Sequence, residues 1–327
     1  MKKPKRPQVA GGEIIRQLRE DLHVMRRQVA EIQVYVDKTL NIASRQFDLL
    51  AERTARPYFA LDNGWGLTNL DSGQPFFINT TDRNITPWIL MGGHWEPNVE
   101  RVLLQATREN MTVLDIGAHF GYYTVKLGSK LKNGGRIHSF EPNPRVNAVC
   151  LENIKINRLS GIASLHRCAL GDEAGFGILT WPGSNMSSAN LVGEQEAEFS
   201  ERVEIRTLDS VIPESETIDL IKLDAEGYEQ KILLGARKTL ARSPDCLIVI
   251  ELNLDRWERG APLDNLLSLC GDERKRAFAI ASDGSLLPMD VTEIRAFLLQ
   301  CDYHENYFLI GNRIVIETLM APLLIKK

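Results

Sequence analysis

The chain lacks several features that would place it among membrane, secreted or nucleic-acid-binding proteins. No apolar stretch reaches membrane-spanning length, and the basic start MKKPKRPQVAGGE has no apolar core of a signal peptide. The five cysteines show no C-x-x-C spacing, so they predict neither a zinc site nor a disulfide framework. The net charge of −4 provides no excess of positive charge for nucleic acid. We therefore expect buried thiols, a cytoplasmic location and no nucleic-acid partner.

A dinucleotide fingerprint, G-x-G-x-x-G, is also absent from the most informative turn of the chain. That turn reads DIGAHFGYYT at 115–124 and follows the apolar run 111–114. Gly117 and Gly121 allow the backbone to pass close to a ligand, because neither carries a Cβ. A further glycine, which a pyrophosphate site requires, is missing. The turn therefore predicts a nucleoside site without a pyrophosphate.

Two carboxylates beside this turn indicate what the nucleoside carries. Asp115 comes at the mouth of the strand, where a carboxylate favours a cationic ligand. Glu141 lies 20 residues after Gly121, the usual place for a carboxylate that accepts both ribose hydroxyls. S-adenosylmethionine is the common nucleoside with a positive charge and no phosphate. In the alternative interpretation, Asp115 merely caps the following helix.

The motifs of the chain resemble those of the FkbM family of S-adenosylmethionine-dependent methyltransferases. Members usually read DIGAN-x-G-x-x-T, FEPNP, an Asn-rich helix, ALGD, T-L-D, K-[IL]-D-x-E-G and a strand that ends in Glu. The matching segments are DIGAHFGYYT, FEPNP at 140–144, LENIKIN at 151–157, ALGD at 169–172, TLDSV at 207–211, IKLDAEGYE at 221–229 and IVIEL at 248–252. His119 departs from the family, which usually has Asn at this position.

The pattern after Val99 alternates helix and strand, which predicts a doubly wound α/β fold with a mostly parallel sheet. The resemblance implies the class I methyltransferase, Rossmann-like form of this fold, closed by two antiparallel strands. Parallel strands are expected near 111–115, 136–140, 162–168, 218–224 and 246–251. A hairpin near 277–288 and a strand at 307–311 should follow, and the apolar tail 313–325 should dock on the protein or on a second subunit.

The organisation before this domain is less regular. Residues 1–12 should be a disordered basic tail. Residues 13–56 predict a long helix with apolar residues at heptad spacing, typical of a coiled coil that makes a homo-oligomer; the alternative is a helix packed on its own domain. Residues 57–98 contain short strands that form a lid or one wall of the acceptor site, or a hairpin that covers the sheet. The methyltransferase domain should span 99–327.

The catalytic candidates are acidic and lie at the expected strand ends. Asp224 is the first choice as a general base or as a ligand of an activating divalent cation such as magnesium, whose requirement the sequence leaves open. Glu226, two residues on, can point to the same side; it can equally begin the following helix. His94 could act as a base at neutral pH. No zinc spacing of His or Cys is present.

The remaining site residues follow mainly from the motifs. Residues expected to hold the donor are Asp115, Gly117, His119, Phe120, Gly121, Glu141, Pro142, Cys168, Ala169, Leu170, Asp172 and Asp224. Among them, Cys168 to Leu170 should flank the adenine, and Asp172 should accept from its amine. Residues expected to hold the acceptor are Trp95, Glu96, Asn185, Ser187, Ser188 and Glu251.

The resemblance implies methylation of a hydroxyl, most often on a sugar of a glycan, glycolipid or glycosylated metabolite. A first alternative is methylation of a nitrogen or a carboxylate in a small metabolite. A second is a coiled-coil assembly protein with a non-catalytic methyltransferase-like domain. The intact acidic motifs favour the enzyme.

Overall fold

The computed structural model describes residues 56–181, 190–192, 199–260, 262–300 and 306–325. The predicted tail and long helix before residue 56, and the polar loop with Asn185, Ser187 and Ser188, lie outside these ranges. Within them, no helix combines the length and the apolar character that crossing a membrane requires.

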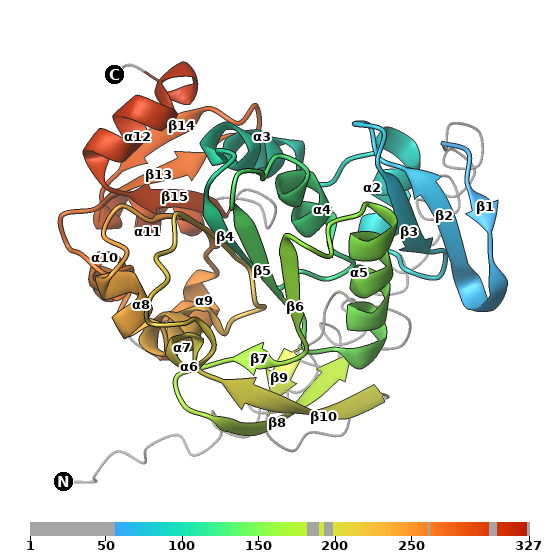
Figure 1. The fold of residues 1–327 in the computed structure, drawn as a ribbon. Helices are drawn as coiled ribbons and strands as arrows, with labels where there is room; N and C mark the ends of the chain where they lie inside the picture. Colours follow the sequence, from blue (N-terminus) through green and yellow to red (C-terminus); the bar gives the residue numbers. More distant parts are fainter. Residues whose placement is uncertain (1–55, 182–189, 193–198, 261, 301–305, 326–327) are drawn as a thin grey trace, which may run out of the picture. The chain divides into compact units, whose positions relative to one another are not determined.

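An eight-stranded sheet forms the centre of the domain, in the order β14-β13-β15-β12-β11-β4-β5-β6 (Figure 1). Its strands are β4 (Thr112–Ile116), β5 (Arg136–Phe140), β6 (Ala163–His166), β11 (Leu220–Leu223), β12 (Leu247–Glu251), β13 (Arg276–Ile280), β14 (Leu286–Met289) and β15 (Tyr307–Gly311). The five strands from β12 to β6 are parallel, and β15, β13 and β14 are antiparallel. The predicted class I fold and its strands are confirmed, but three antiparallel strands close the sheet instead of two.

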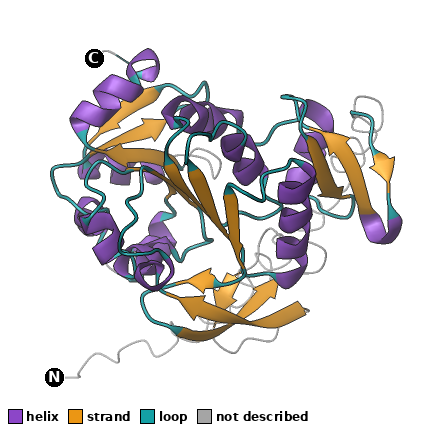
Figure 2. Cartoon of the chain, in the orientation of Figure 1, coloured by secondary structure: helices purple, strands orange, loops and turns teal. Residues whose placement is uncertain are grey.

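Helices cover both faces of this sheet (Figure 2). One face packs against α3 (Pro97–Ala106), α4 (Tyr122–Gly128), α5 (Pro144–Ile156) and α12 (Arg313–Leu319); the other packs against α6 (Leu208–Val211), α7 (Glu229–Leu234), α8 (Arg237–Ala241), α9 (Leu254–Trp257), η3 (Leu263–Asn265), α10 (Leu266–Leu269) and α11 (Val291–Leu298). Neighbouring strand residues alternate between the two cores: Val249 packs on the first face and Ile250 on the second. Each buried Leu or Ile side chain contributes about 1.5–3 kcal/mol, so this double layer holds the strand ends rigidly.

A second sheet extends the domain beyond β6, in the order β7-β10-β8-β9. Its strands are β7 (Ala169–Leu170), β8 (Gly175–Trp181), β9 (Asn190–Val192) and β10 (Phe199–Arg206). The sequence analysis did not predict this sheet, in which β10 lies between β7 and β8, so that the spatial order differs from the chain order. The sheet matters for the site because β7 holds Ala169 and Leu170 at the end of the central sheet.

The segment before the first glycine turn folds as a small antiparallel sheet followed by a helix. The elements are β1 (Phe59–Ala60), η1 (Asp62–Gly64), β2 (Trp65–Asn69), β3 (Pro75–Asn79) and α2 (Ile85–Gly92). Asn153 on α5 fixes the hairpin: its Oδ1 accepts from the Phe77 amide at 2.6 Å, and its Nδ2 donates to the Phe77 carbonyl at 3.2 Å and to the Phe120 carbonyl at 2.8 Å. One buried amide thus ties the hairpin to the glycine turn.

The C-terminal segment docks on the domain itself, as one of the two alternatives had it. Ile316 and Met320, on and just after α12, are fully buried, and Leu323 in η4 (Ala321–Leu323) is 5% exposed. Leu324 forms a parallel bridge with Leu286 of β14. The tail therefore covers the edge formed by the antiparallel strands.

Candidate functional site

A cavity of about 560 Å³ opens at the carboxyl ends of the parallel strands. Its lining combines the turn after β4, the end of β5, β7, the loops after β11 and β12, the start of β15 and the segment from residue 83 to 98. Ligands of open α/β sheets bind at this edge. The cavity therefore coincides with the site expected from the motifs.

The turn after β4 depends on its glycines. Gly117 has φ +80, and a Cβ on it would lie 1.8 Å from the carbonyl oxygen of Asp224. Gly121 has φ +85, and a Cβ there would lie 2.7 Å from the Cys150 sulfur. The amides of Gly117 and Ala118 both donate to the Phe140 carbonyl, at 3.1 and 3.0 Å. The turn is therefore held by backbone bonds and by the absence of two side chains.

His119 takes the place of the usual Asn within this turn, and its backbone shows why both residue types fit. Its φ is +49, in the left-handed region that Asn and His enter more readily than most residues. Burial lowers the pKa of its imidazole to about 4, so the ring is neutral. The ring lies 3.9 Å from the Phe120 ring, centroid to centroid, and both residues line the cavity.

Glu141 directly follows β5 and connects the two predicted elements of the donor site. Its Oε2 accepts from the His119 amide at 3.0 Å, and its Oε1 accepts from the Asn143 amide at 2.8 Å. Burial raises the pKa of this carboxyl to about 7 despite these two bonds. Glu141 and Pro142 both line the cavity.

Only part of the segment expected to contact the adenine lies at the cavity. Cys168, Ala169 and Leu170 line it, and Leu179 of β8, which the sequence did not indicate, adds a fourth apolar side chain. The assignment of Asp172 to the cavity is wrong. The Gly171 amide donates to the Arg206 carbonyl, so the chain continues into the second sheet and leaves Asp172 exposed outside the lining.

Asp115 also differs from its expected position at the strand mouth. It lies inside β4, is fully buried and does not line the cavity. Its Oδ2 accepts from the Thr124 hydroxyl at 2.6 Å, while its buried Oδ1 has no hydrogen-bond partner within the part of the chain that the structure describes. Burial raises the pKa of this carboxyl. Asp115 therefore supports the turn through Thr124 and does not line the cavity.

The opposite side of the cavity is built around a buried lysine. Lys222 Nζ lies 3.0 Å from Asp224 Oδ2 and donates to the Gly117 carbonyl at 3.3 Å. Burial alone would lower the pKa of Lys222, but the charges of Asp224, Asp115 and Glu96 raise it above its ordinary value. The same lysine outweighs the burial of Asp224 and lowers the pKa of its carboxyl. Lys222 and Asp224 therefore form a charged pair.

Two tyrosines connect this pair to Glu96. The Tyr307 hydroxyl lies 2.9 Å from Asp224 Oδ2 and 3.0 Å from Glu96 Oε1, and the Tyr123 hydroxyl donates to Glu96 Oε2 at 2.9 Å. A hydroxyl has one proton and cannot donate to two ionised carboxylates at once. Burial and the charge of Asp224 raise the pKa of Glu96 to about 7. Near neutral pH Glu96 therefore carries a proton part of the time and can donate to Tyr307.

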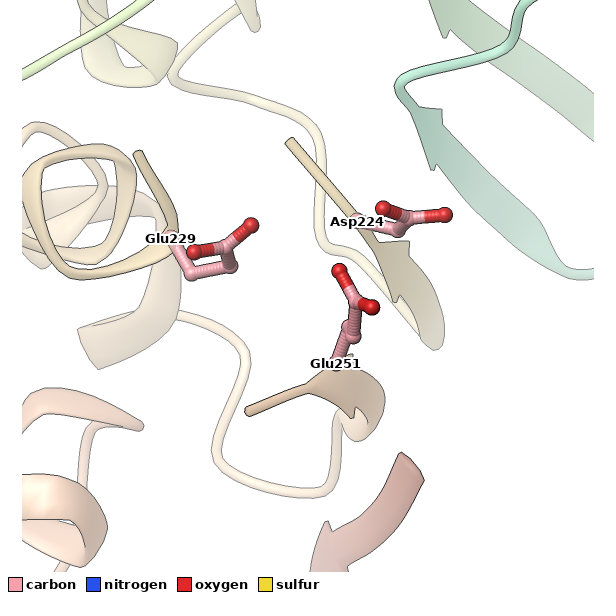
Figure 3. Close-up of side chains that lie close together, drawn as sticks. All are labelled: Asp224, Glu229 and Glu251. Carbon is pink, nitrogen blue, oxygen red and sulfur yellow. The ribbon is translucent and has the colours of Figure 1, made fainter. Parts of the chain in front are cut away.

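Three carboxylates gather beside this network (Figure 3). Asp224 follows β11, Glu251 ends β12 and Glu229 begins α7; one oxygen of each lies within 4.8 Å of the others. Glu229 Oε1 accepts from the amides of Ala225 and Gly227, at 2.8 and 3.0 Å. Burial, followed by the charge of Asp224, raises the pKa of Glu251 to about 9.

Glu226 lines the cavity next to this group, with its backbone at φ +52. Its Oε2 lies 2.9 Å from Arg256 Nη1. This ion pair ties the carboxylate to α9.

The outer wall comes from the segment before α3. Trp95 and Glu96 line the cavity as expected, together with Arg83 and Trp88. The rings of Trp88 and Trp95 meet edge to face, with centroids 6.4 Å apart. The prediction for His94 is wrong: its Nδ1 lies 3.8 Å from Asp71 Oδ2, in a separate hollow behind the wall, because the turn after α2 directs adjacent side chains to opposite sides.

The site residues missed from the sequence include Lys222, Tyr123, Asn306 and Tyr307. A signal existed for the lysine, since a charged residue inside the apolar run IKL has a buried position. Asn306 and Tyr307 come to the site because β15 is antiparallel, so its first residue lies beside the last residue of β12. That placement depends on the strand order, which the sequence pattern left open.

Comparison with known proteins agrees with the motifs. The chain is 28% identical over 158 residues to "Methyltransferase sdnD" of Sordaria araneosa, covering 38% of this chain and 60% of the relative. It is 23% identical over 144 residues to "Methyltransferase 1" of Beauveria bassiana, covering 38% and 57%. The chain thus spans less than two thirds of these curated relatives. A solved FkbM methyltransferase from Methylobacillus flagellatus KT is 16% identical, with a TM-score of 0.42 and coverage of 62% of this chain and 44% of that one.

The family assignment itself comes from a match to the FkbM methyltransferase domain. The match runs over residues 115–305, from the glycine turn to the segment just before β15, which is more than half of the chain. It confirms the resemblance seen in the motifs: the chain belongs to the FkbM methyltransferase family.

Proposed function

We propose that this protein transfers a methyl group from S-adenosylmethionine to a hydroxyl, and that the hydroxyl belongs to a sugar of a glycan, glycolipid or glycosylated metabolite. One observation carries the proposal. A single cavity contains the glycine turn with Glu141 on one side and the Lys222–Asp224 pair with further acidic groups on the other. The first side suits a nucleoside donor and the second suits a hydroxyl acceptor.

The residues of the first side fit the donor. A volume of about 560 Å³ is that of an ordinary small-molecule site. Ala169, Leu170 and Leu179 offer apolar contact to an adenine ring. Each oxygen of Glu141 accepts one backbone amide and keeps a second lone pair, which can accept a ribose hydroxyl.

The charge of the cavity also fits. Its lining contains Glu96, Glu141, Asp224, Glu226 and Glu251, against the basic residues Arg83 and Lys222. In their ionised forms these carboxyl groups favour a ligand with a positive sulfur, because opposite charges attract strongly where little water is present.

The donor, when bound, supplies a methyl group on that positive sulfur. The protein must hold the acceptor oxygen about 3 Å from the methyl carbon and opposite the sulfur, which is worth roughly 7–11 kcal/mol. The donor would supply the methyl group and leave with the C–S electron pair on its sulfur, and Asp224 would accept the hydroxyl proton. A positioned base of this kind adds roughly 10²- to 10⁴-fold. Placement therefore contributes more than the base.

The acceptor side favours a polyol over a carboxylate. Glu96, Glu251 and Asn306 offer oxygen atoms to hydroxyl donors, and Trp95 offers an aromatic face to a sugar ring. An acceptor carboxylate would be repelled by the acidic groups. An amine acceptor is attracted in its protonated form but must lose that proton before it can attack, so it is the second candidate.

Calorimetry of the full chain with S-adenosylmethionine and S-adenosylhomocysteine tests the proposal. We expect both to bind, and Glu141→Gln to weaken each by roughly 10- to 100-fold, since hydrogen bonds to a charged group are worth about 1.5–3 kcal/mol. The glutamine would also turn its NH₂ toward one of two backbone amides that need an acceptor. Glu152→Gln, on the exposed side of α5, is the matched control. No heat with either compound at millimolar concentration would remove the enzyme interpretation.

We also propose that residues 13–56 pair with a second copy of the chain, as their heptad spacing predicts. Deleting residues 1–55 should lower the mass measured by light scattering to that of a single chain. If the number of chains per particle is the same with and without the segment, the segment packs on its own domain. The cytoplasmic location stays a prediction.

A further inference from the structure

The cluster of Asp224, Glu229 and Glu251 brings together three carboxylates from separate elements (Figure 3). Acidic groups also gather on protein surfaces where no ion is bound, so their proximity alone carries little. This cluster is different because a neutral oxygen donor accompanies it.

That donor is Asn306, which directly precedes β15 and is 4% exposed. Its Nδ2 donates to Glu251 Oε1 at 3.0 Å, and the side chain lines the cavity with Glu251. Its Oδ1 is buried without a hydrogen-bond partner in the described ranges. An unsatisfied buried polar atom costs about 1–3 kcal/mol. A ligand that accepts electron density from this oxygen would remove that cost.

The charges of the cluster are not balanced by side chains. Lys222 contacts Asp224, and Arg256 contacts Glu226. Among the described residues, no lysine or arginine forms an ion pair with Glu229 or Glu251. The hydrogen bonds from the Ala225 and Gly227 amides both fall on Oε1 of Glu229. Carboxylates this close in a partly dry site cannot all ionise without protons or a cation.

We propose that Asp224, Glu229, Glu251 and Asn306 bind a divalent cation, and that Mg²⁺ or Mn²⁺ is the ion. The donor set contains only oxygen, which these hard cations prefer to softer metals. A cation held by one oxygen from each residue keeps coordination positions open toward the cavity. The role of the cation rests on the proposed function: it would bind oxygen atoms of the acceptor beside Asp224 and Glu96.

Manganese binding tests the site without any methyl transfer. The full chain, freed of metal with a chelator and then dialysed, is titrated with Mn²⁺ at pH 8 while electron paramagnetic resonance follows the free ion. We expect one Mn²⁺ per chain, displaced by Mg²⁺. Glu251→Gln and Glu229→Gln should each weaken binding at least tenfold. Glutamine at 229 keeps an oxygen that accepts from the Ala225 and Gly227 amides of the loop before α7, so loss of binding there is not loss of the fold.

Two further variants separate coordination from charge. Glu226→Gln removes one negative charge from the same cavity but no ligand, and we expect less than a threefold change in Mn²⁺ affinity. Asn306→Asp replaces a neutral ligand with a charged one, so it should tighten Mn²⁺ binding and make the melting temperature rise when Mn²⁺ is added. Equal weakening by Glu226→Gln and Glu251→Gln would show a diffuse charge effect and overturn the site.

Binding of S-adenosylmethionine is measured in a parallel experiment, in the presence of the chelator. Binding of S-adenosylmethionine without any binding of Mn²⁺ would overturn the metal site and leave the proposed function in place, with protons holding the cluster together. Binding of Mn²⁺ by a protein that does not bind S-adenosylmethionine would overturn the proposed function and leave the metal site in place. Failure of both would remove both proposals.

Discussion

The two sides of the cavity are held together by different kinds of contact. On the donor side, the contacts are mostly to backbone: the Phe140 carbonyl accepts from Gly117 and Ala118, and Glu141 accepts from two amides. On the acceptor side, they join side chain to side chain, from Lys222 through Asp224 and Tyr307 to Glu96. Backbone contacts survive a change of residue type, as His119 illustrates, whereas a buried side-chain network needs every member. The donor side should therefore tolerate most substitutions and the acceptor side few.

The largest effect is expected from removing the buried cation on the acceptor side. Lys222→Met keeps the length of the side chain but leaves Asp224 charged and unpaired, and breaking a buried pair in this way costs about 3–5 kcal/mol. Denaturant unfolding measures the loss. Lys132→Met, whose lysine pairs with Glu109 on the surface, is the control and should cost less than about 1 kcal/mol. Similar losses for both variants would mean that the network tolerates a missing member.

On the donor side, Gly117 should be a residue that does not tolerate substitution. Gly117→Ala combines a left-handed backbone, about 1–2 kcal/mol, with a Cβ 1.8 Å from the Asp224 carbonyl, for a total of about 2–5 kcal/mol. Gly134→Ala separates the two causes, because Gly134 also has a positive φ but nothing within 4 Å of its Cβ. If both variants lose equal stability, the close approach to Asp224 has no energetic weight.

A smaller effect is expected from Tyr307→Phe, which removes only the hydroxyl between Asp224 and Glu96. Both carboxyl groups lose a partner, so we expect a loss of about 1–3 kcal/mol in the free energy of unfolding. The cavity should keep its affinity for S-adenosylmethionine, since Tyr307 belongs to the acceptor side. Tyr58→Phe, on an exposed ring, is the control. Loss of donor affinity in the Tyr307 variant would show that the two sides are not separate.

The smallest effect is a dependence of donor affinity on pH. The pKa values of Glu141 and Glu96 are both raised to about 7, so each carboxyl gains a proton as the pH falls through 7. A positively charged ligand favours the ionised form, and its affinity should be greatest above pH 8 and fall at lower pH, by at most about tenfold per pH unit for each group. Calorimetry at pH 6, 7 and 8 measures this fall. S-adenosylhomocysteine, whose sulfur is neutral, should show a weaker dependence; the same slope for both would exclude the sulfonium as its cause.

The stability of the ligand-free protein should change with pH in the same range. The folded-state pKa of Glu141 lies above the ordinary value of 4.5, so the folded protein binds more protons than the unfolded chain between these pH values. The contribution of this group to stability is therefore complete below pH 4.5 and is lost as the pH rises through 7. Binding of S-adenosylmethionine would reduce this loss of stability.

The sequence by itself predicted the glycine turn and Glu141 on the donor side, because these elements are local. The spacing from Gly117 to Glu141 lies within one strand–helix–strand unit, and the two motifs specify their own backbone shape. The alternation of apolar runs also predicted the parallel strands, and the motifs indicated the family. The assignments of Asp115 and Asp172 were wrong for a shared reason: a motif position does not specify which face of a strand or turn a side chain takes.

Only the tertiary structure decided the acceptor side. Asp224, Glu251 and Asn306 come from three separate strand ends, and they meet because β15 runs antiparallel beside β12. The charge states of Lys222, Glu96 and Glu251 likewise follow from burial and from neighbours that are distant in the chain. A local pattern can predict that a turn binds a nucleoside, but burial and Coulomb energies depend on every group packed around a site, and those groups are known only once the chain has folded.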